Sequence, residues 1–126
     1  MAKFVFGCYR KAITADENLM AKTKKIIERI VPKNLQHIAK QETIISKHTF
    51  LAIFNNHGHF KQDKNSICIG KMFGQNLDWS KIGTEKPDGN YVLIRNEEKK
   101  QELEILNDIL GTRAVWFVQT DDFFML

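Results

Sequence analysis

The stretch Thr49-Phe50-Leu51-Ala52-Ile53-Phe54 decides the fold, because a short run of β-branched and aromatic residues is typical of a β-strand. Working outward, the same composition predicts further strands at Lys3 to Tyr9, His37 to Ala39, Thr43 to Ile45, Ser66 to Ile69, Tyr91 to Arg95, Val115 to Val118 and Phe123 to Leu126. Many short strands with one early helix predict an α+β domain built on antiparallel sheet.

The early helix begins after the capping box Thr14-Ala15-Asp16-Glu17 and ends at Pro32. Its predicted apolar side carries Leu19, Met20, Ile26, Ile27 and Ile30. Its other side carries Lys22, Lys24, Lys25 and Arg29. This basic side is most simply a solvated surface, with a binding patch as the alternative.

Two turns separate the predicted strands. Asn and Gly in Asn55-Asn56-His57-Gly58-His59 tolerate positive φ and indicate a turn. Residues 96–100 form a second, charged segment that predicts a hairpin-like turn, and a short helix from Glu98 to Leu106 is the competing interpretation.

Composition bounds the class of protein. A chain of 126 residues and 14.7 kDa can bury one core, so we expect a single domain over residues 1–126. The net charge of +4 comes from lysines spread among acids, which argues against nucleic-acid binding. Without an apolar stretch near 18 residues or a signal-peptide layout, we expect no membrane span and a cytoplasmic protein. Cys8 and Cys68 lie in apolar runs and are interpreted as small buried residues.

Two segments point to a family. Asp88-Gly89-Asn90-Tyr91 is similar to the "D-G-x-[FY]-A" segment of class II glutamine amidotransferase domains, best known from asparagine synthetase. The run from Asp108 through Gly111 and Arg113 to Phe117 resembles the "D-x-x-G-x-[KR]-x-[LVI]-[YW]-[YF]" segment of the same family. Ile69 to Gly74 is similar to its "G-x-[IL]-[FY]" piece. The resemblance implies a glutaminase-type αββα sandwich with antiparallel sheets and flanking helices.

The same resemblance implies that catalysis is lost. Family members use an N-terminal cysteine as nucleophile, whereas the corresponding position here is Ala2, and a methyl group cannot attack an amide. Cleavage before Cys8 would expose a new N-terminal cysteine, but Tyr9 and Arg10 follow where the family has Gly and Ile or Val. Cys8 is therefore the less favoured nucleophile.

The substrate-binding elements of the family are also altered. Its oxyanion pair Asn-Gly is matched only by Asn56-His57-Gly58, with a histidine inserted, and its "R-G-P-D" clamp has no counterpart between Asn34 and His48. Asn56, Gly58, Asp88 and Gly89 are the candidate substrate-binding residues.

Other polar clusters are interpreted structurally. His57 and His59 could offer two imidazoles to a metal, but no third ligand lies nearby in sequence, so we expect no metal site. Asp121-Asp122 is interpreted as a hairpin turn, and Asp108 with Arg113 as stabilising its own turn.

The sequence therefore predicts a degenerate glutaminase-like domain of an asparagine synthetase-like protein. The expected partner is a C-terminal ATP-pyrophosphatase domain, which would use ATP and Mg; no cofactor is expected in these residues. A chain that stops within the apolar run Phe123 to Leu126 suggests a piece of a longer protein, with an edge strand at a natural terminus as the alternative. The second hypothesis is a stand-alone module that binds a partner protein through its sheet or basic helix, and a homodimer is also compatible.

Overall fold

The computed structural model describes residues 3–13, 17–35, 41–54, 59–74 and 78–126. These residues form one α-helix, α1 (Glu17–Ile30), one short 3₁₀ helix (Lys33–Leu35) and nine strands. The strands are β1 (Lys3–Tyr9), β2 (Gln41–Ile45), β3 (Thr49–Phe54), β4 (Phe60–Asp63), β5 (Ser66–Met72), β6 (Gly89–Glu97), β7 (Glu102–Asn107), β8 (Val118–Gln119) and β9 (Phe123–Met125). Every strand pairing is antiparallel, so the α+β prediction is confirmed.

The chain divides into two compact units. Unit 1 comprises residues 1–57 and 115–126, and unit 2 comprises residues 58–114. Each unit holds its own sheet: sheet A, with the order β2-β3-β1-β9-β8, belongs to unit 1, and sheet B, with the order β4-β5-β6-β7, belongs to unit 2. The expectation of one domain over 1–126 stays a prediction.

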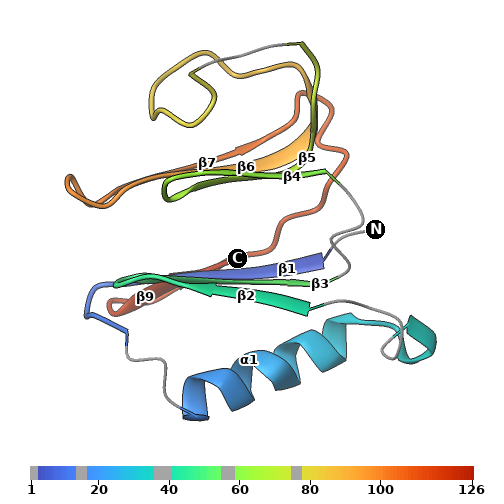
Figure 1. Cartoon of the computed structure of the whole chain (residues 1–126), viewed down its shortest axis with the longest axis vertical. Coiled ribbons are helices and arrows are strands. Elements are labelled where there is room, and N and C mark those ends of the chain that lie inside the picture. The colour runs from blue at the N-terminus through green and yellow to red at the C-terminus, as the bar shows by residue number, and fades with distance from the viewer. Residues whose placement is uncertain (1–2, 14–16, 36–40, 55–58, 75–77) are drawn as a thin grey trace. The chain divides into compact units, whose positions relative to one another are not determined.

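In unit 1, α1 runs along one face of sheet A (Figure 1). Side chains alternate between the two faces of a strand, so β1 and β3 each present one set to the helix. The set that packs with α1 includes Val5, Phe50 and Ala52, which are buried against Ile27 and Val31. The set on the opposite face is equally apolar and consists of Phe6, Leu51 and Ile53.

The apolar side of α1 differs in one residue from its prediction. Ile27 is the buried centre of the helix, and Leu19, Ile26 and Ile30 pack beside it. Met20 lies on the same side of the helix but is 41% exposed, so it is not buried with them. Position 20 is seven residues before Ile27 and within about 20° of it around the helix, so the helical period does not explain the exposure of Met20, which lies in the first turn of α1. Thr23 is buried in its place and donates to the carbonyl of Leu19 at 2.8 Å.

In unit 2, four consecutive strands form a meander, and residues 78–88, the described part of the connection that follows β5, lie over one face of it (Figure 1). That face carries the buried cluster of Cys68, Tyr91 and Leu93, with Trp79 of the connection packed against it. The opposite face carries Ile67, Ile69, Val92 and Ile94, all at most 5% exposed. Sheet B therefore has an apolar side chain set on each face, like sheet A.

Five stretches differ from their predictions or lie outside the described residues. Residues 102–107 form a strand and not the competing helix, since they pair with β6 and leave residues 98–101 as the hairpin turn. β4 was not predicted. Residues 115–117 are not in a strand, because sheet A reaches only Val118 and Gln119 of that run. The expected strand at residues 37–39 and the expected cap at Thr14 lie outside the described residues.

Candidate functional site

Only some of the candidate site residues are described. The expected nucleophile position, Ala2, and the oxyanion-like turn of Asn56, His57 and Gly58 lie outside the described residues. Cys8, Asp88 and Gly89 are described, in β1 and at the start of β6.

Cys8 lies near the end of β1, in the middle of sheet A. It pairs with Thr49 of β3 on one side and with Phe124 of β9 on the other. Its side chain is partly exposed, in contrast with the interpretation of Cys8 as buried, whereas Cys68 is fully buried as expected. A strand bordered on both sides leaves little room for a mobile chain end at this position.

The close approach of β5 and β6 determines the surroundings of Asp88 and Gly89. The carbonyl of Asp88 accepts from the N–H of Phe73 at 2.7 Å. Gly89 has φ +155°, and a Cβ there would lie 2.3 Å from the carbonyl oxygen of Lys71. Only glycine allows β5 and β6 to come this close, so Gly89 has a structural reason to be present.

The second family-like segment forms a tight turn after β7. One carboxylate oxygen of Asp108 accepts from the N–H of Thr112 at 2.8 Å, and the other accepts from the Thr112 hydroxyl. The N–H of Gly111, at φ +60°, donates to the carbonyl of Asp108 at 3.0 Å. These bonds, led by that of the Thr112 side chain, lower the pKa of Asp108 from its ordinary value. The carboxylate therefore serves as an internal cap, as predicted, rather than as a general base.

The two family-like segments meet at this turn. Arg113 donates from Nε to Oδ1 of Asn90 at 3.0 Å. The N–H of Asp108 donates to the carbonyl of Tyr91 at 3.2 Å, and Nδ2 of Asn107 donates to the carbonyl of Arg113 at 2.6 Å. We call this group, Asn90, Tyr91 and residues 107–113, the Asp108 turn. Two of its hydrogen bonds join residues that are 17 and 23 positions apart in the sequence.

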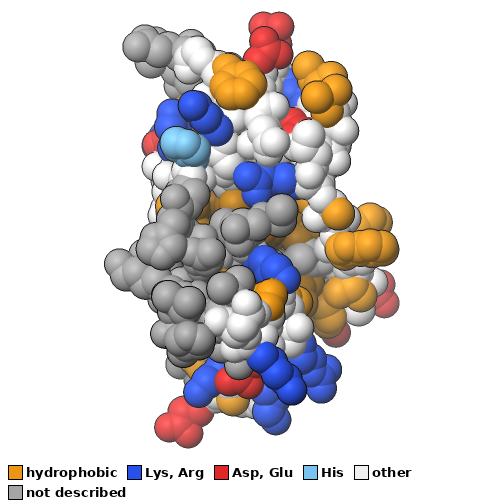
Figure 2. Space-filling view, turned by 90° about the vertical axis from the view of Figure 1, so that its right-hand side faces the viewer, with side chains coloured by type: hydrophobic (Ala, Val, Ile, Leu, Met, Phe, Trp, Pro, Cys, Tyr) orange, Lys and Arg blue, Asp and Glu red, His pale blue; other side chains and the backbone are white. Residues whose placement is uncertain are grey.

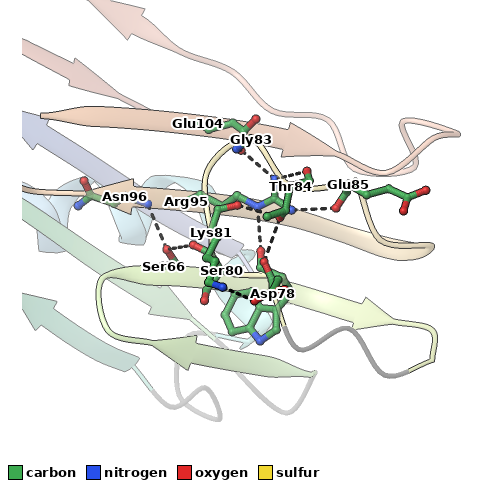
Figure 3. Close-up of polar contacts among 11 residues, drawn as sticks. Ser66, Asp78, Ser80, Lys81, Gly83, Thr84, Glu85, Arg95, Asn96 and Glu104 are labelled. Carbon is green, nitrogen blue, oxygen red and sulfur yellow. Dashed lines mark hydrogen bonds and ion pairs between the residues drawn. The ribbon is translucent and has the colours of Figure 1, made fainter. Parts of the chain in front are cut away.

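A second polar cluster, centred on Arg95, was missed by the sequence analysis (Figure 3). The Arg95 side chain is completely buried and donates to three backbone carbonyls of the connection that follows β5: Trp79 at 2.8 Å, Thr84 at 2.9 Å and Glu85 at 3.1 Å. Its Nη1 also lies 2.8 Å from Oε2 of Glu104. The one sequence signal for it is a charged residue directly after the buried run Tyr91 to Ile94.

Serine hydroxyls extend the Arg95 cluster toward β4 and β5. Ser66 donates to the carbonyl of Ser80 at 2.8 Å and accepts from the N–H of Asn96 at 3.2 Å (Figure 3). The hydroxyl of Ser80 donates to a carboxylate oxygen of Asp63. The donors of Arg95 and these hydroxyls are thus used to hold the connection in place, and no reactive group results.

The remaining thiol in unit 2 is unsuited to nucleophilic chemistry. Burial raises the pKa of Cys68 to about 11, outweighing the opposing influence of Lys61 and Arg113. A thiol with such a pKa is almost entirely protonated near pH 7, and the thiolate is the nucleophile.

Within the described ranges, no group of three or more His, Cys, Asp or Glu side chains is placed to hold a metal ion. His57 of the His57-x-His59 pair is outside them. Nor does any helix among the described residues have the length and apolar character needed to cross a membrane.

Comparison of the chain with protein-family models, with curated proteins and with solved structures found no match in any of the three.

Proposed function

We propose that this chain is a non-catalytic, glutaminase-like domain that serves as a structural module of an asparagine synthetase-like protein. The observation that carries the proposal is the Asp108 turn. The two sequence segments that resemble the family, Asp88 to Tyr91 and Asp108 to Phe117, are linked there through Arg113 and Asn90. Segments that are parts of one inherited site are expected to lie together in the fold.

The αββα sandwich of the family is part of this proposal. In support, sheets A and B each carry buried apolar residues on both faces, and α1 packs on one face of sheet A. One difference from the family is that the cover of sheet B in the described residues is an irregular connection and not a helix.

The absence of glutaminase chemistry is proposed from Ala2 and from the position of Cys8. A methyl side chain cannot replace the family's thiol. Cleavage before Cys8 would remove residues 3–7, which pair with residues 50–54 in sheet A. Losing that strand would leave β3 and β9 without their shared neighbour, so a processed and active form is disfavoured.

In this proposal, the chemistry belongs to a C-terminal ATP-pyrophosphatase domain that would use ATP and Mg. The glutaminase-like domain would support that domain and form a wall of its site. The proposal assigns no cofactor to residues 1–126.

The test uses the protein as it is natively expressed. Its intact mass is measured first, followed by ammonia release from glutamine and ATP–pyrophosphate exchange. We expect a chain longer than Leu126, no ammonia release, and exchange that depends on a carboxylate substrate. A mass near 14.7 kDa without exchange would refute the synthetase assignment. A mass lower by residues 1–7, together with ammonia release, would refute the non-catalytic assignment.

A second candidate, a stand-alone protein-interaction module, is favoured by exposed aromatic side chains in unit 1. Trp116 is 85% exposed and Phe117 is 70% exposed, which is unusual for side chains of this size. Phe117 stacks on Phe124 with ring centroids 5.9 Å apart, so one aromatic is anchored to sheet A. The mass and exchange measurements described above separate this candidate from the first.

A further inference from the structure

The outer side of α1 carries a row of three basic side chains. Lys22, Lys25 and Arg29 are all exposed. Residues at positions i, i+3 and i+7 lie on one side of a helix, so the three cations form a single line. We call this line the basic row. With a rise of about 1.5 Å per residue, it extends over roughly 10 Å along the helix axis.

The basic row lies in the unit that holds all of the net charge. Residues 1–57 and 115–126 contain ten basic and six acidic residues, whereas residues 58–114 contain nine of each. Unit 1 therefore has a charge of +4 and unit 2 is neutral. Basic side chains gather at the lower end of the space-filling view, the end where α1 lies in Figure 1 (Figure 2).

No ion pair joins the row to an acidic residue in the described part of the chain, although the exposed Glu28 lies three residues after Lys25 on the same helix. The ion pairs found there are Lys81 with Asp78 and Arg95 with Glu104, both in unit 2. No hydrogen bond or ion pair joins the side chains of the basic row to another described residue. The apolar side of the same helix is buried against sheet A, so the row is held in a fixed direction.

We infer that the basic row is a docking surface for an acidic helical segment of a partner protein. A helix whose glutamates or aspartates repeat at three- and four-residue intervals presents carboxylates at the same spacing as Lys22, Lys25 and Arg29. Charge complementarity favours this occupant, since unit 1 is positive and Lys22, Lys25 and Arg29 form no ion pair with another described residue. This surface does not depend on the proposed glutaminase-like family.

Two other anionic partners fit less well. Single-stranded nucleic acid is usually bound with aromatic side chains that stack on bases, and α1 contains no aromatic residue. Membrane surfaces are usually bound by clusters of about four to eight basic residues or by an inserted apolar side. The basic row has three cations, and the apolar side of α1 is occupied by sheet A.

The probe is a synthetic alanine-rich helix with three glutamates on one side, labelled for fluorescence anisotropy. A second peptide of identical composition has the glutamates scattered around the helix. The protein variants are the triple substitution K22Q/K25Q/R29Q and the control K86Q/K99Q/K100Q, which removes three exposed charges from unit 2. Circular dichroism checks that both variants keep the fold.

We expect the one-sided peptide to bind the unaltered chain, and to bind K22Q/K25Q/R29Q at least about tenfold more weakly. The control should change the affinity by less than about twofold, and raising the salt should weaken binding. Equal loss in both triple variants, equal affinity for the scattered peptide, or no binding at about 1 mM would overturn the proposal. Tighter binding of single-stranded RNA or of phosphatidylserine vesicles would overturn the choice of a protein partner.

Discussion

Arg95 and Glu104 face each other across β6 and β7, with Nη1 2.8 Å from Oε2, and the arginine side chain is completely buried while the glutamate is 29% exposed. The same carboxylate oxygen accepts from the N–H of Gly83 at 3.3 Å. The pair therefore connects the sheet with the irregular connection that covers it. A buried arginine of this kind is tolerated because almost all of its donors are used.

Replacing Arg95 by methionine should destabilise unit 2 by about 2–4 kcal/mol, since three carbonyls and a carboxylate lose their donor. The measurement is urea unfolding followed by Trp79 fluorescence in a Trp116→Phe background. Glu104→Gln is the matched control, because an amide oxygen can still accept, and it should cost about 1 kcal/mol. Equal effects of the two variants would contradict the central role of Arg95.

Asp108 should make stability depend on pH on the acid side. Its folded pKa is lowered, chiefly by the Thr112 hydroxyl, so its contribution is present above the ordinary carboxyl pKa and is lost as the pH falls through the lowered one. The stability difference between the unaltered chain and Asp108→Asn should be largest near neutral pH and should shrink in acid. Melting temperatures measured from pH 7 to pH 2 test this. A difference that stays constant over that range would show that the charge of Asp108 is unimportant.

Gly70→Ala should strongly destabilise sheet B. Gly70 has φ +123°, and a Cβ there would lie 2.2 Å from the carbonyl oxygen of Asn90 and 2.7 Å from Cα of Tyr91. Backbone atoms cannot move aside cheaply, so we expect a loss of more than about 2 kcal/mol in chemical denaturation. Gly83→Ala is the control: its φ is +76° but no atom lies within 4 Å, so only backbone strain of about 1 kcal/mol remains.

Cys68 should resist alkylation in the folded protein. It is fully buried with a pKa of about 11, whereas Cys8 is partly exposed. Iodoacetamide at pH 8 should add one group, at Cys8, and the second only after unfolding, as read by peptide mass spectrometry. Because the folded pKa of Cys68 is raised from 9.0, its contribution to stability should be lost as the pH rises from about 9 to 11. Rapid labelling of Cys68 at pH 8 would contradict its burial.

Ile27→Ala should cost about 2–4 kcal/mol, because Ile27 is 4% exposed at the centre of the contact between α1 and sheet A. Met20→Ala, at a 41% exposed position in the first turn of the same helix, should cost less than about 1 kcal/mol. Urea midpoints of the two variants give the comparison. Similar losses would show that Met20 contributes as much to the packing of α1 as Ile27 does.

Local sequence patterns correctly predicted those elements whose amino-acid composition favours the same conformation as their pairing and packing in the fold. The apolar runs at β1, β3 and β6 and the amphipathic pattern of α1 were found in place. The competing interpretation of a helix from Glu98 to Leu106 was wrong. Glu and Leu favour a helix locally, but pairing with β6 makes residues 102–107 a strand. The strand predicted at residues 115–117 is absent from the structure. An aromatic run becomes a strand only where a neighbouring strand pairs with it, and β9 pairs only with Val118 and Gln119 of this run.

In the candidate site, only the contacts between residues close together in the sequence could be predicted. The capping of its own turn by Asp108 follows from the short spacing to Gly111 and Thr112. The bond from Arg113 to Asn90 and the cluster around Arg95 depend on strand register, which no short motif contains. A single charged residue after an apolar run could equally well have been the exposed end of a strand.

The pairing of β1 with β9 has a consequence for the order of folding during synthesis. Gly7 pairs with Met125, 118 residues further along the chain, so sheet A cannot be completed until the last strand has left the ribosome. Sheet B is a meander of neighbouring strands, each paired with the next, and such low contact order favours rapid folding. In the nascent chain, the meander of sheet B should therefore fold early. At that stage β1 can pair with β3, but the edge of β1 that pairs with β9 is still unpaired. During that interval, the open strand edge is the part of the chain most exposed to mispairing and aggregation.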